Sequence, residues 1–458
     1  MSDKSKVSSS ELALIHPNAA GIDIGSTSHF IAIPADRCDE SVQEFQCFTS
    51  DLHRAAQWLK DHGITTVAME STGVYWLPLY EILSAAGLDV KLVNARQVKN
   101  VPGRKTDVLD CQWIQRLHSY GLLEGAFQPD QAILPLRAYT RHRENWTRYA
   151  GVPIQHMQKA LRLMNLNLDA VVTDITGTTG TAIIQAILKG ERDAQVLAGF
   201  RDGRCKKSEE DIAQALDGHY REEQVFALQQ AFDSYTFYRQ QIADCDQQMA
   251  ACLDQLNQAA PDKPHSSEGG KRSKTRRHRH EPDFNLRGEL YRLTGVDLTT
   301  IDGIGAYTAL KVISETGTDM TRWGNAKRFC SWLGLAPGSK ISGGKVISAK
   351  TKPTANRAAA ALRLAAQSVS RSRSALGAYY RKKRYHLGAP KAITATAHKL
   401  ARILYALLSQ GGTYEDLGET AYEAKYQARV KDNLMRKARR LGYDLIPIGM
   451  GENVNKVA

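Results

Sequence analysis

The chain lacks the features that mark secreted, zinc-binding and membrane-spanning proteins. Its seven cysteines among 458 residues are scattered and form no C-x-x-C pair, which argues against a zinc site and against a secreted disulfide framework. No apolar run approaches the roughly 18 residues that a membrane span needs, and the N-terminus MSDKSKVSSSELALIHP has no signal-peptide core. We therefore expect a cytoplasmic protein with no membrane partner.

The chain also lacks the phosphate-binding loops of most ATP-hydrolysing folds. It contains no Walker-type G-x-x-x-x-G-K-S/T sequence. The stretch AAGIDIGSTSHFIAIPA (19–35) predicts two strands joined by a tight turn, an arrangement that opens both actin-like ATPases and ribonuclease-H-like enzymes. An actin-like fold needs a second loop of the form D-x-G-T, and the nearest sequence, DITGTTG (174–180), has one residue too many before its glycine. The ribonuclease-H-like interpretation is therefore favoured.

The charge balance of the chain is strongly basic. The formal net charge of +13 and the pI near 9.3 indicate a polyanionic partner, although an ordinary basic protein is the alternative. Residues 259–283 form a linker in which KRSKTRRHRH holds six Lys or Arg in ten residues. Such a segment cannot bury a core, and we expect it to hold nucleic acid by charge alone through Arg276, Arg277 and Arg279.

The region from about residue 19 to residue 125 alternates strand and helix patterns. After the opening hairpin the sequence predicts a strand over 43–48, a helix over 51–63, a strand over 64–70, a helix over 76–87, a strand over 88–94 and a helix over 105–121. The last helix begins near Thr106, a residue type that caps helix N-termini. This order predicts an α/β domain with a mixed sheet.

Four acidic residues fall on these elements where they can meet. Asp23 lies in the middle of the first strand, and Glu70 ends a strand that can neighbour it. Asp107 and Asp110 share a face of the last helix, at an N-terminus that favours carboxylates. Singly, each has a plain explanation as a surface acid. Together they would repel one another, and a pair of Mg²⁺ ions about 3.5–4 Å apart, or Mn²⁺ as a substitute, would remove that conflict and serve phosphodiester displacement.

The middle of the chain carries a heptad pattern. Apolar residues recur at alternating spacings of three and four at Leu228, Ala231, Tyr235, Tyr238, Ile242, Cys245, Met249, Cys252 and Leu256. This pattern predicts a helix with a seam that favours a self-associating coiled coil. The alternative is one amphipathic helix packed on the core of its own chain.

The C-terminal part contains two glycine-rich segments. Gly303 and Gly305 in LTTIDGIGAYTALKVISETG indicate a helix-hairpin-helix, in which glycines let backbone N–H groups approach phosphates; a plain turn between helices is the alternative. Further on, we expect a flexible loop that presents Ser339, Ser342 and Lys345. A mobile, exposed serine beside a lysine suits a nucleophile that accepts a phosphoryl group, although such a pattern is also common in polar loops.

Five motifs, GIDIG, MESTGVYW, GRKTDVLDCQWIQRL, IDGIGAYTA and WLGLAPGSKISGGK, occur in this order. With them the sequence resembles the DEDD transposases, which are insertion-sequence recombinases guided by a bridge RNA, over most of 19–410. The resemblance implies a RuvC-like ribonuclease-H domain, a coiled coil and a mainly helical transposase domain. It also implies that the four metal-binding acids are Asp23, Glu70, Asp107 and Asp110, and that the nucleophile is Ser342, with Ser339 close enough to compete.

The resemblance further implies partners and an assembly. A structured non-coding guide RNA would pair with donor and target double-stranded DNA, and the composite site would form within a homo-oligomer, from dimer to tetramer, at the nucleoid of a prokaryotic cell. The segment near 190–225, the basic linker and the basic tail after 411 make the chain longer than the compact family pattern. The expected domains are the RuvC-like part, the helical and coiled-coil part, the transposase domain and the tail, over 1–135, 136–290, 291–410 and 411–458.

Two other functions fit parts of this pattern. A metal-only junction resolvase or nuclease of the same fold would need the four acids and no serine. A nucleic-acid-binding scaffold without catalysis would need neither. DNA cleavage by a metal-only enzyme should survive Ser342→Ala, whereas cleavage by a serine recombinase should not. A scaffold without catalysis should keep all its activities in Asp23→Asn.

Overall fold

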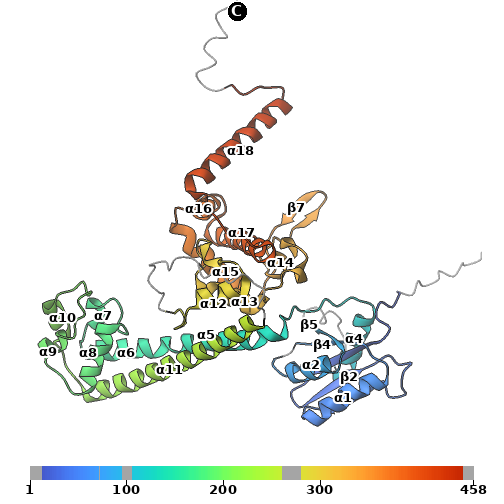
Figure 1. The fold of residues 1–458 in the computed structure, drawn as a ribbon, viewed down its shortest axis with the longest axis horizontal. Helices are drawn as coiled ribbons and strands as arrows, with labels where there is room; N and C mark the ends of the chain where they lie inside the picture. The colour runs from blue at the N-terminus through green and yellow to red at the C-terminus, as the bar shows by residue number, and fades with distance from the viewer. Residues whose placement is uncertain (1–12, 72, 95–105, 260–279, 447–458) are drawn as a thin grey trace, which may run out of the picture. The chain divides into compact units, whose positions relative to one another are not determined.

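A computed structural model describes residues 13–71, 73–94, 106–259 and 280–446 (Figure 1). The chain divides into two compact units, residues 1–128 and 129–458. Each unit is described by itself below.

The first unit is built on a five-stranded mixed sheet in the order β3-β2-β1-β4-β5. Its strands are β1 (Ala19–Ile24), β2 (Ser28–Ala32), β3 (Val42–Gln46), β4 (Thr66–Glu70) and β5 (Asp89–Val93). The β1–β2 and β2–β3 pairs are antiparallel, whereas β1–β4 and β4–β5 are parallel. The predicted mixed sheet is therefore confirmed, and it fits a ribonuclease-H-like domain.

Helices cover the two faces of this sheet through alternate residues of its strands. On one face Ile22 and Ile24 join a core with α1 (Thr49–Asp61) and α2 (Trp76–Ala85). On the other face Ala68 packs with Ile114 of α4 (Asp107–Ser119). Because side chains alternate along a strand, Gly21 and Asp23, which flank Ile22, face α4.

Gly21 allows α4 to lie directly on the central strand. A Cβ atom at this position would stand 2.1 Å from the backbone nitrogen of Gln115 and 2.4 Å from the carbonyl oxygen of Cys111. Thr106 caps α4 as predicted, since its hydroxyl accepts a hydrogen bond from the Leu109 N–H at 3.3 Å. The N-terminus of α4 is thus held close to β1.

The second unit begins with long helices that pair along their length. After η1 (Gln131–Ile133), α5 (Leu134–Tyr149) and α6 (Gly151–Leu163) both pack against α11 (Glu222–Gln258), a helix of 37 residues. The heptad residues Leu228, Ile242 and Met249 are buried there. Much of the predicted seam is therefore covered within the chain, and an intermolecular coiled coil stays a prediction.

The segment near 190–225 belongs to a small helical subdomain at one end of α11. It comprises α7 (Leu168–Val171), α8 (Thr178–Leu188), α9 (Ala194–Ala198) and α10 (Glu209–Leu216). Leucine and isoleucine side chains from these helices form a core that also takes in Leu228 of α11. The extra length is therefore folded structure that caps the helical pair.

The rest of the second unit is mainly helical, as predicted. Its helices are α12 (Leu286–Thr294), α13 (Ala306–Thr316), α14 (Ala326–Trp332), α15 (Arg357–Ser368), α16 (Ala375–Leu387), α17 (Ala389–Gln410) and α18 (Gly418–Arg440), with 3-10 turns η2 (Leu298–Thr300), η3 (Thr321–Trp323) and η4 (Val369–Arg371). A two-stranded hairpin of β6 (Lys340–Ser342) and β7 (Lys345–Ser348) is inserted between α14 and α15.

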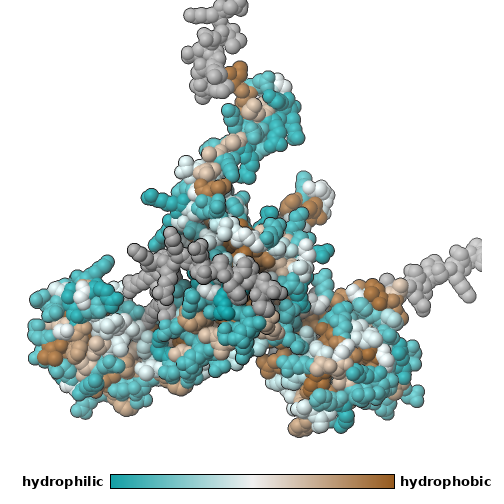
Figure 2. Space-filling model, viewed as in Figure 1, coloured by the Kyte–Doolittle hydropathy of each residue, from teal (hydrophilic) through white to brown (hydrophobic). Residues whose placement is uncertain are grey.

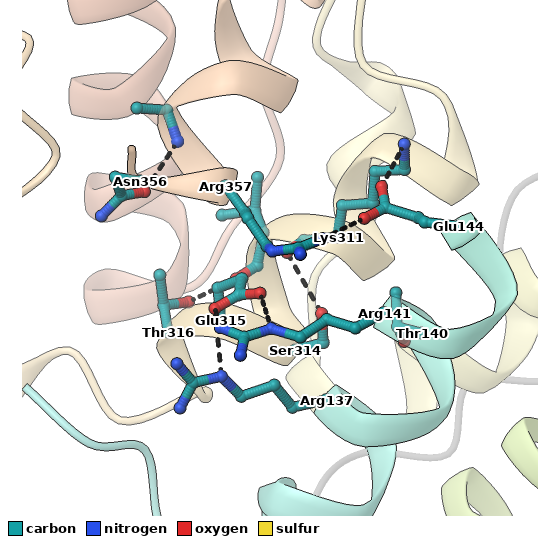
Figure 3. Close-up of polar contacts among 12 residues, drawn as sticks. Arg137, Thr140, Arg141, Glu144, Lys311, Ser314, Glu315, Thr316, Asn356 and Arg357 are labelled. Atoms are coloured by element: carbon teal, nitrogen blue, oxygen red, sulfur yellow. Dashed lines mark hydrogen bonds and ion pairs between the residues drawn. The ribbon is translucent and has the colours of Figure 1, made fainter. Parts of the chain in front are cut away.

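Ion pairs bind α5 to α13 and α15 (Figure 3). The buried carboxylate of Glu315 accepts hydrogen bonds from Arg137 Nε at 3.1 Å and from Arg141 Nη2 at 2.6 Å. Glu144 pairs with Lys311 at 2.6 Å and with Arg357 at 3.1 Å. These contacts join the long helical pair to the C-terminal helices of the same unit.

Candidate functional site

The sheet register places Asp23 and Glu70 side by side. Ile22 of β1 lies opposite Met69 of the parallel strand β4, so the next residue of each strand is one of these two acids. Asp23 lies two positions after Gly21 and Glu70 two positions after Ala68, and both of these residues face α4, so the acids share that face. Two carboxylates therefore stand at the same edge of the sheet, on the face that α4 covers.

The other two acids come from the first turn of α4. Asp107 is its first residue, and Asp110 follows three positions later. The close contact between Gly21 and α4 at Cys111 brings this turn near Asp23. The helix N-terminus, with its unpaired N–H groups, is a favourable place for negative charge.

The electrostatics of Asp23 report that the four acids are neighbours. The pKa of Asp23 is raised from 3.8 to about 6, first by burial and then by the carboxylates of Asp110, Asp107 and Glu70. A backbone hydrogen bond at Ile24 acts in the opposite direction but does not offset them. The fold has therefore collected three carboxylates around the partly buried carboxylate of Asp23, which is costly without a compensating cation.

The donor set suits Mg²⁺ or Mn²⁺, which prefer carboxylate oxygens. Among the residues that the structure describes, no three His, Cys, Asp or Glu side chains are gathered closely enough to hold a metal ion as they stand. The acids lie on one face of the sheet and influence the pKa of Asp23, but their side chains are not placed at the distances of metal ligands. Their assignment as metal ligands stays a proposal.

Ser342 lies on a short projecting hairpin of the second unit. It is the last residue of β6 and pairs in register with Lys345, the first residue of β7. Gly343 and Gly344 form the turn between them with φ of 53° and 75°, the left-handed conformations that two-residue hairpin turns require. Ser342 and Lys345 are both exposed.

The expectation of a flexible loop around Ser342 was wrong in one respect. The segment pairs as two strands because ISGGKV alternates side chains on either side of a Gly-Gly turn, a hairpin signal. Ser339 lies in the exposed segment just before β6. The hairpin therefore holds Ser342 at its tip and Ser339 at its base.

The predicted nucleic-acid-binding residues differ in where the structure places them. Gly303 has a φ of 85°, and a Cβ there would stand 2.4 Å from Val369 Cγ1, so this glycine is needed for packing within the chain. Gly305 is the N-cap residue of α13. Arg276, Arg277 and Arg279 lie outside the described residues. Contact of these residues, and of Lys345, with nucleic acid remains a prediction.

The sequence interpretation gave no role to Gly21, which positions the site. A glycine in the interior of an apolar strand is the signal that another backbone approaches closely. In GIDIG this signal stands two residues before Asp23. It allows another backbone to approach β1, and the structure shows that this backbone is that of α4.

Two models of transposase families match the chain, one over the region of the four acids and one over the region of Ser342. A transposase model of the IS110 DEDD type matches residues 20–165, which include all four acids. A model described as transposase of the IS116/IS110/IS902 family matches residues 295–381, which include Gly303, Gly305 and Ser342. The chain belongs to the IS110 family of DEDD-type insertion-sequence transposases. No protein of curated function matches the sequence.

Membership of this transposase family fixes the coarse activity. The chain is an enzyme that cleaves DNA and transfers strands, and its substrates are DNA. DEDD nuclease-like domains typically use divalent metals. No helix among the described residues is long and apolar enough to cross a membrane.

Proposed function

We propose that this transposase is a site-specific recombinase that joins DNA through a serine–phosphate intermediate, with Asp23, Glu70, Asp107 and Asp110 holding Mg²⁺. The observation that carries the metal-binding part is the placement of Asp23 beside Glu70 in the sheet and near the first turn of α4, which together with burial raises the pKa of Asp23. A cluster of this kind is a typical feature of a functional site. When bound, two Mg²⁺ ions would neutralise the cluster and stabilise charge on the scissile phosphate.

Ser342 is the proposed nucleophile. Its Oγ would form a bond to phosphorus while losing its proton, and the bond from phosphorus to one strand oxygen would break as that oxygen takes up a proton. The phosphoserine link keeps the energy of the phosphodiester for rejoining. Exposure at the tip of the hairpin and the neighbouring Lys345 support this role. Ser339 is the competing candidate.

The acids and Ser342 belong to different compact units of the chain. We infer that they meet in a composite site of a homo-oligomer, between dimer and tetramer, whose domains are 1–135, 136–290, 291–410 and 411–458. A structured non-coding RNA would select donor and target DNA. The basic balance of the chain, with a net charge of +13, supports such a polyanionic partner.

A metal-only junction resolvase is the second candidate, because all four acids lie in the first unit without Ser342. The two are separated by incubating the purified protein with DNA that spans the ends of its own element, in Mg²⁺ or in EDTA. The recombinase predicts that Ser342→Ala abolishes cleavage. Cleavage that survives Ser342→Ala and Ser339→Ala, yet needs Mg²⁺, would establish the resolvase instead.

The guide RNA is tested by sequencing the nucleic acid that accompanies the protein through purification at moderate salt. A single structured RNA, encoded beside the gene and carrying segments that match the element's junction, is the expected result. Heterogeneous RNA, or none from a folded protein, would contradict RNA guidance. If Asp23→Asn abolished the activity of the protein, the protein would still be distinguished from a scaffold without catalysis.

A further inference from the structure

A hollow of about 610 Å³ is lined by residues of α14, α16 and α17. The second family match ends at residue 381, so most of the residues that line this hollow lie beyond it. Ala326, Ile403 and Ala406 give the hollow an apolar floor, and Tyr379, Lys399 and Arg402 line its sides. No acidic side chain is among the lining residues.

The cations and tyrosines of α16 and α17 at the hollow contact further tyrosines and cations of α18. Lys399 Nζ lies 4.6 Å from the centroid of the Tyr379 ring and 5.4 Å from that of Tyr422. The two rings meet edge to face with centroids 6.4 Å apart. On α18, the guanidinium of Arg429 stands 5.4 Å from the Tyr426 ring. We call these residues the basic–aromatic cluster: Tyr379, Lys399, Arg402, Tyr422, Tyr426 and Arg429.

The positive charges of the cluster are not neutralised within the described part of the chain. The first turn of α18 is anchored, because Glu419 pairs with Arg381 at 2.5 Å. Farther along, no described carboxylate forms an ion pair with Lys399, Arg402 or Arg429. The pKa of Lys399 is lowered by burial and then by the nearby cation of Arg429, and Asp416 offsets this only in part. Like charges held together in this way are favoured when an anion joins them.

The visible surface of α18 is mostly hydrophilic (Figure 2), and the helix extends away from α16 (Figure 1). None of its residues is buried. From Lys425 to Arg440 it carries seven Lys or Arg and one acidic residue, Asp432. The helix thus continues the positive potential of the cluster along an exposed track.

We propose that the basic–aromatic cluster is a second nucleic-acid site of this transposase, which binds an unpaired strand with its phosphates on Lys399, Arg402 and Arg429 and its bases against the tyrosines. Grooves that combine cations with aromatic rings hold single strands in this way. A hollow of about 610 Å³ admits one or two nucleotides, whereas a duplex presents a rigid rod whose bases are already stacked. None of its residues is one of the four acids or Ser342.

The test is fluorescence anisotropy of the full chain in EDTA, which excludes cleavage, with labelled (dT)20, (U)20 and a 20-base-pair duplex as probes. Lys399→Gln/Arg402→Gln is compared with a control of equal charge change, Lys60→Gln/Lys189→Gln, whose lysines are exposed and distant in sequence. We expect the first variant to bind a single strand at least about 10-fold more weakly. Its slope of log affinity against log salt should fall by about 1.4, or about 0.7 per lost contact.

Which strand loses affinity identifies the occupant. A loss confined to (U)20 indicates RNA, a loss confined to (dT)20 indicates displaced DNA, and either supports the site. Equal losses for the variant and the control, or an equal loss on the duplex, would overturn it. Arg429→Gln, at an exposed position on α18, provides a variant that does not disturb packing. Ultraviolet cross-links of bound (U)20 or (dT)20 should map to Tyr379 or Tyr422, and cross-links only elsewhere would also count against the proposal.

Discussion

Asp23→Asn should stabilise the metal-free first unit while abolishing activity. The carboxylate has a pKa of about 6 in place of 3.8, and at a pH well above 6 this difference corresponds to about 3 kcal/mol of destabilisation. Because Asp23 is only partly buried, we take about 1–3 kcal/mol as the expected gain. The amide oxygen can still accept the backbone hydrogen bond at Ile24, so that contact is kept.

The sign of the effect with pH follows from the raised pKa. Well below the unfolded pKa of 3.8 the carboxyl is protonated in both folded and unfolded chains, and the variant gains nothing over the wild type. Between about pH 4 and 6 the wild type loses stability because the carboxyl of the unfolded chain is ionised while that of the folded chain still holds its proton, and above pH 6 the loss is complete. The gain from Asp23→Asn should therefore be small at pH 4 and full at pH 8.

Hydrogen exchange measured by mass spectrometry in EDTA reads this gain from β1 and α4 peptides, apart from the second unit. At pH 8 the variant should exchange about 5- to 160-fold more slowly than the wild type, as about 1–3 kcal/mol requires. Asp39→Asn, which removes an exposed loop charge, is the matched control. Exchange in Asp23→Asn that is equal to or faster than in this control at pH 8 would refute the reasoning about the acid cluster.

Three further substitutions test other parts of the account. Gly21→Ala, whose Cβ would stand 2.1 Å from the Gln115 nitrogen, should push α4 from β1 and weaken Mn²⁺ binding in calorimetry at least about 10-fold, or about 1.4 kcal/mol. Gly151→Ala, with open space around it, should leave Mn²⁺ binding unchanged. Equal Mn²⁺ affinities of the two variants would contradict the role of Gly21. Glu315→Ala should lower the free energy of unfolding of the second unit in urea by about 3–5 kcal/mol, since it leaves Arg137 and Arg141 facing each other without their buried partner. Asp130→Ala, which breaks the exposed pair with Arg322, should lower it by only about 0–1 kcal/mol. Similar losses for the two variants would disprove a structural role for the Glu315 ion pairs. Gly303→Ala should be destabilising because of both its φ of 85° and the contact with Val369, and a neutral result by thermal unfolding would show that the turn can adapt.

The sequence predicted the first unit well because its signals are local. Alternation along 19–24 and 64–70 gives the strands, Thr106 marks the start of a helix, and the parallel register then brings Asp23 beside Glu70. The position of α4 over β1 depended on Gly21, a close approach that no periodicity reports.

The second unit was harder to predict because its contacts are distant in sequence. The heptad positions of α11 predict a seam but not its partner, and α5 and α6 of the same chain cover much of it. Likewise the cations on α17 and α18 read as ordinary solvated residues in the sequence. Only the fold sets Lys399 and Arg429 beside the tyrosines of neighbouring helices.

The most direct test of the central claim is to trap and map the covalent intermediate. The full chain, with its co-purified RNA, is incubated in Mg²⁺ with DNA spanning the ends of its element, denatured, digested and analysed by mass spectrometry. A nucleotide attached to Ser342, absent from Asp23→Asn and from samples in EDTA, is the predicted result. Cleaved DNA without any serine adduct, or an adduct that forms equally well in Asp23→Asn, would contradict a site in which the acid cluster and Ser342 act together.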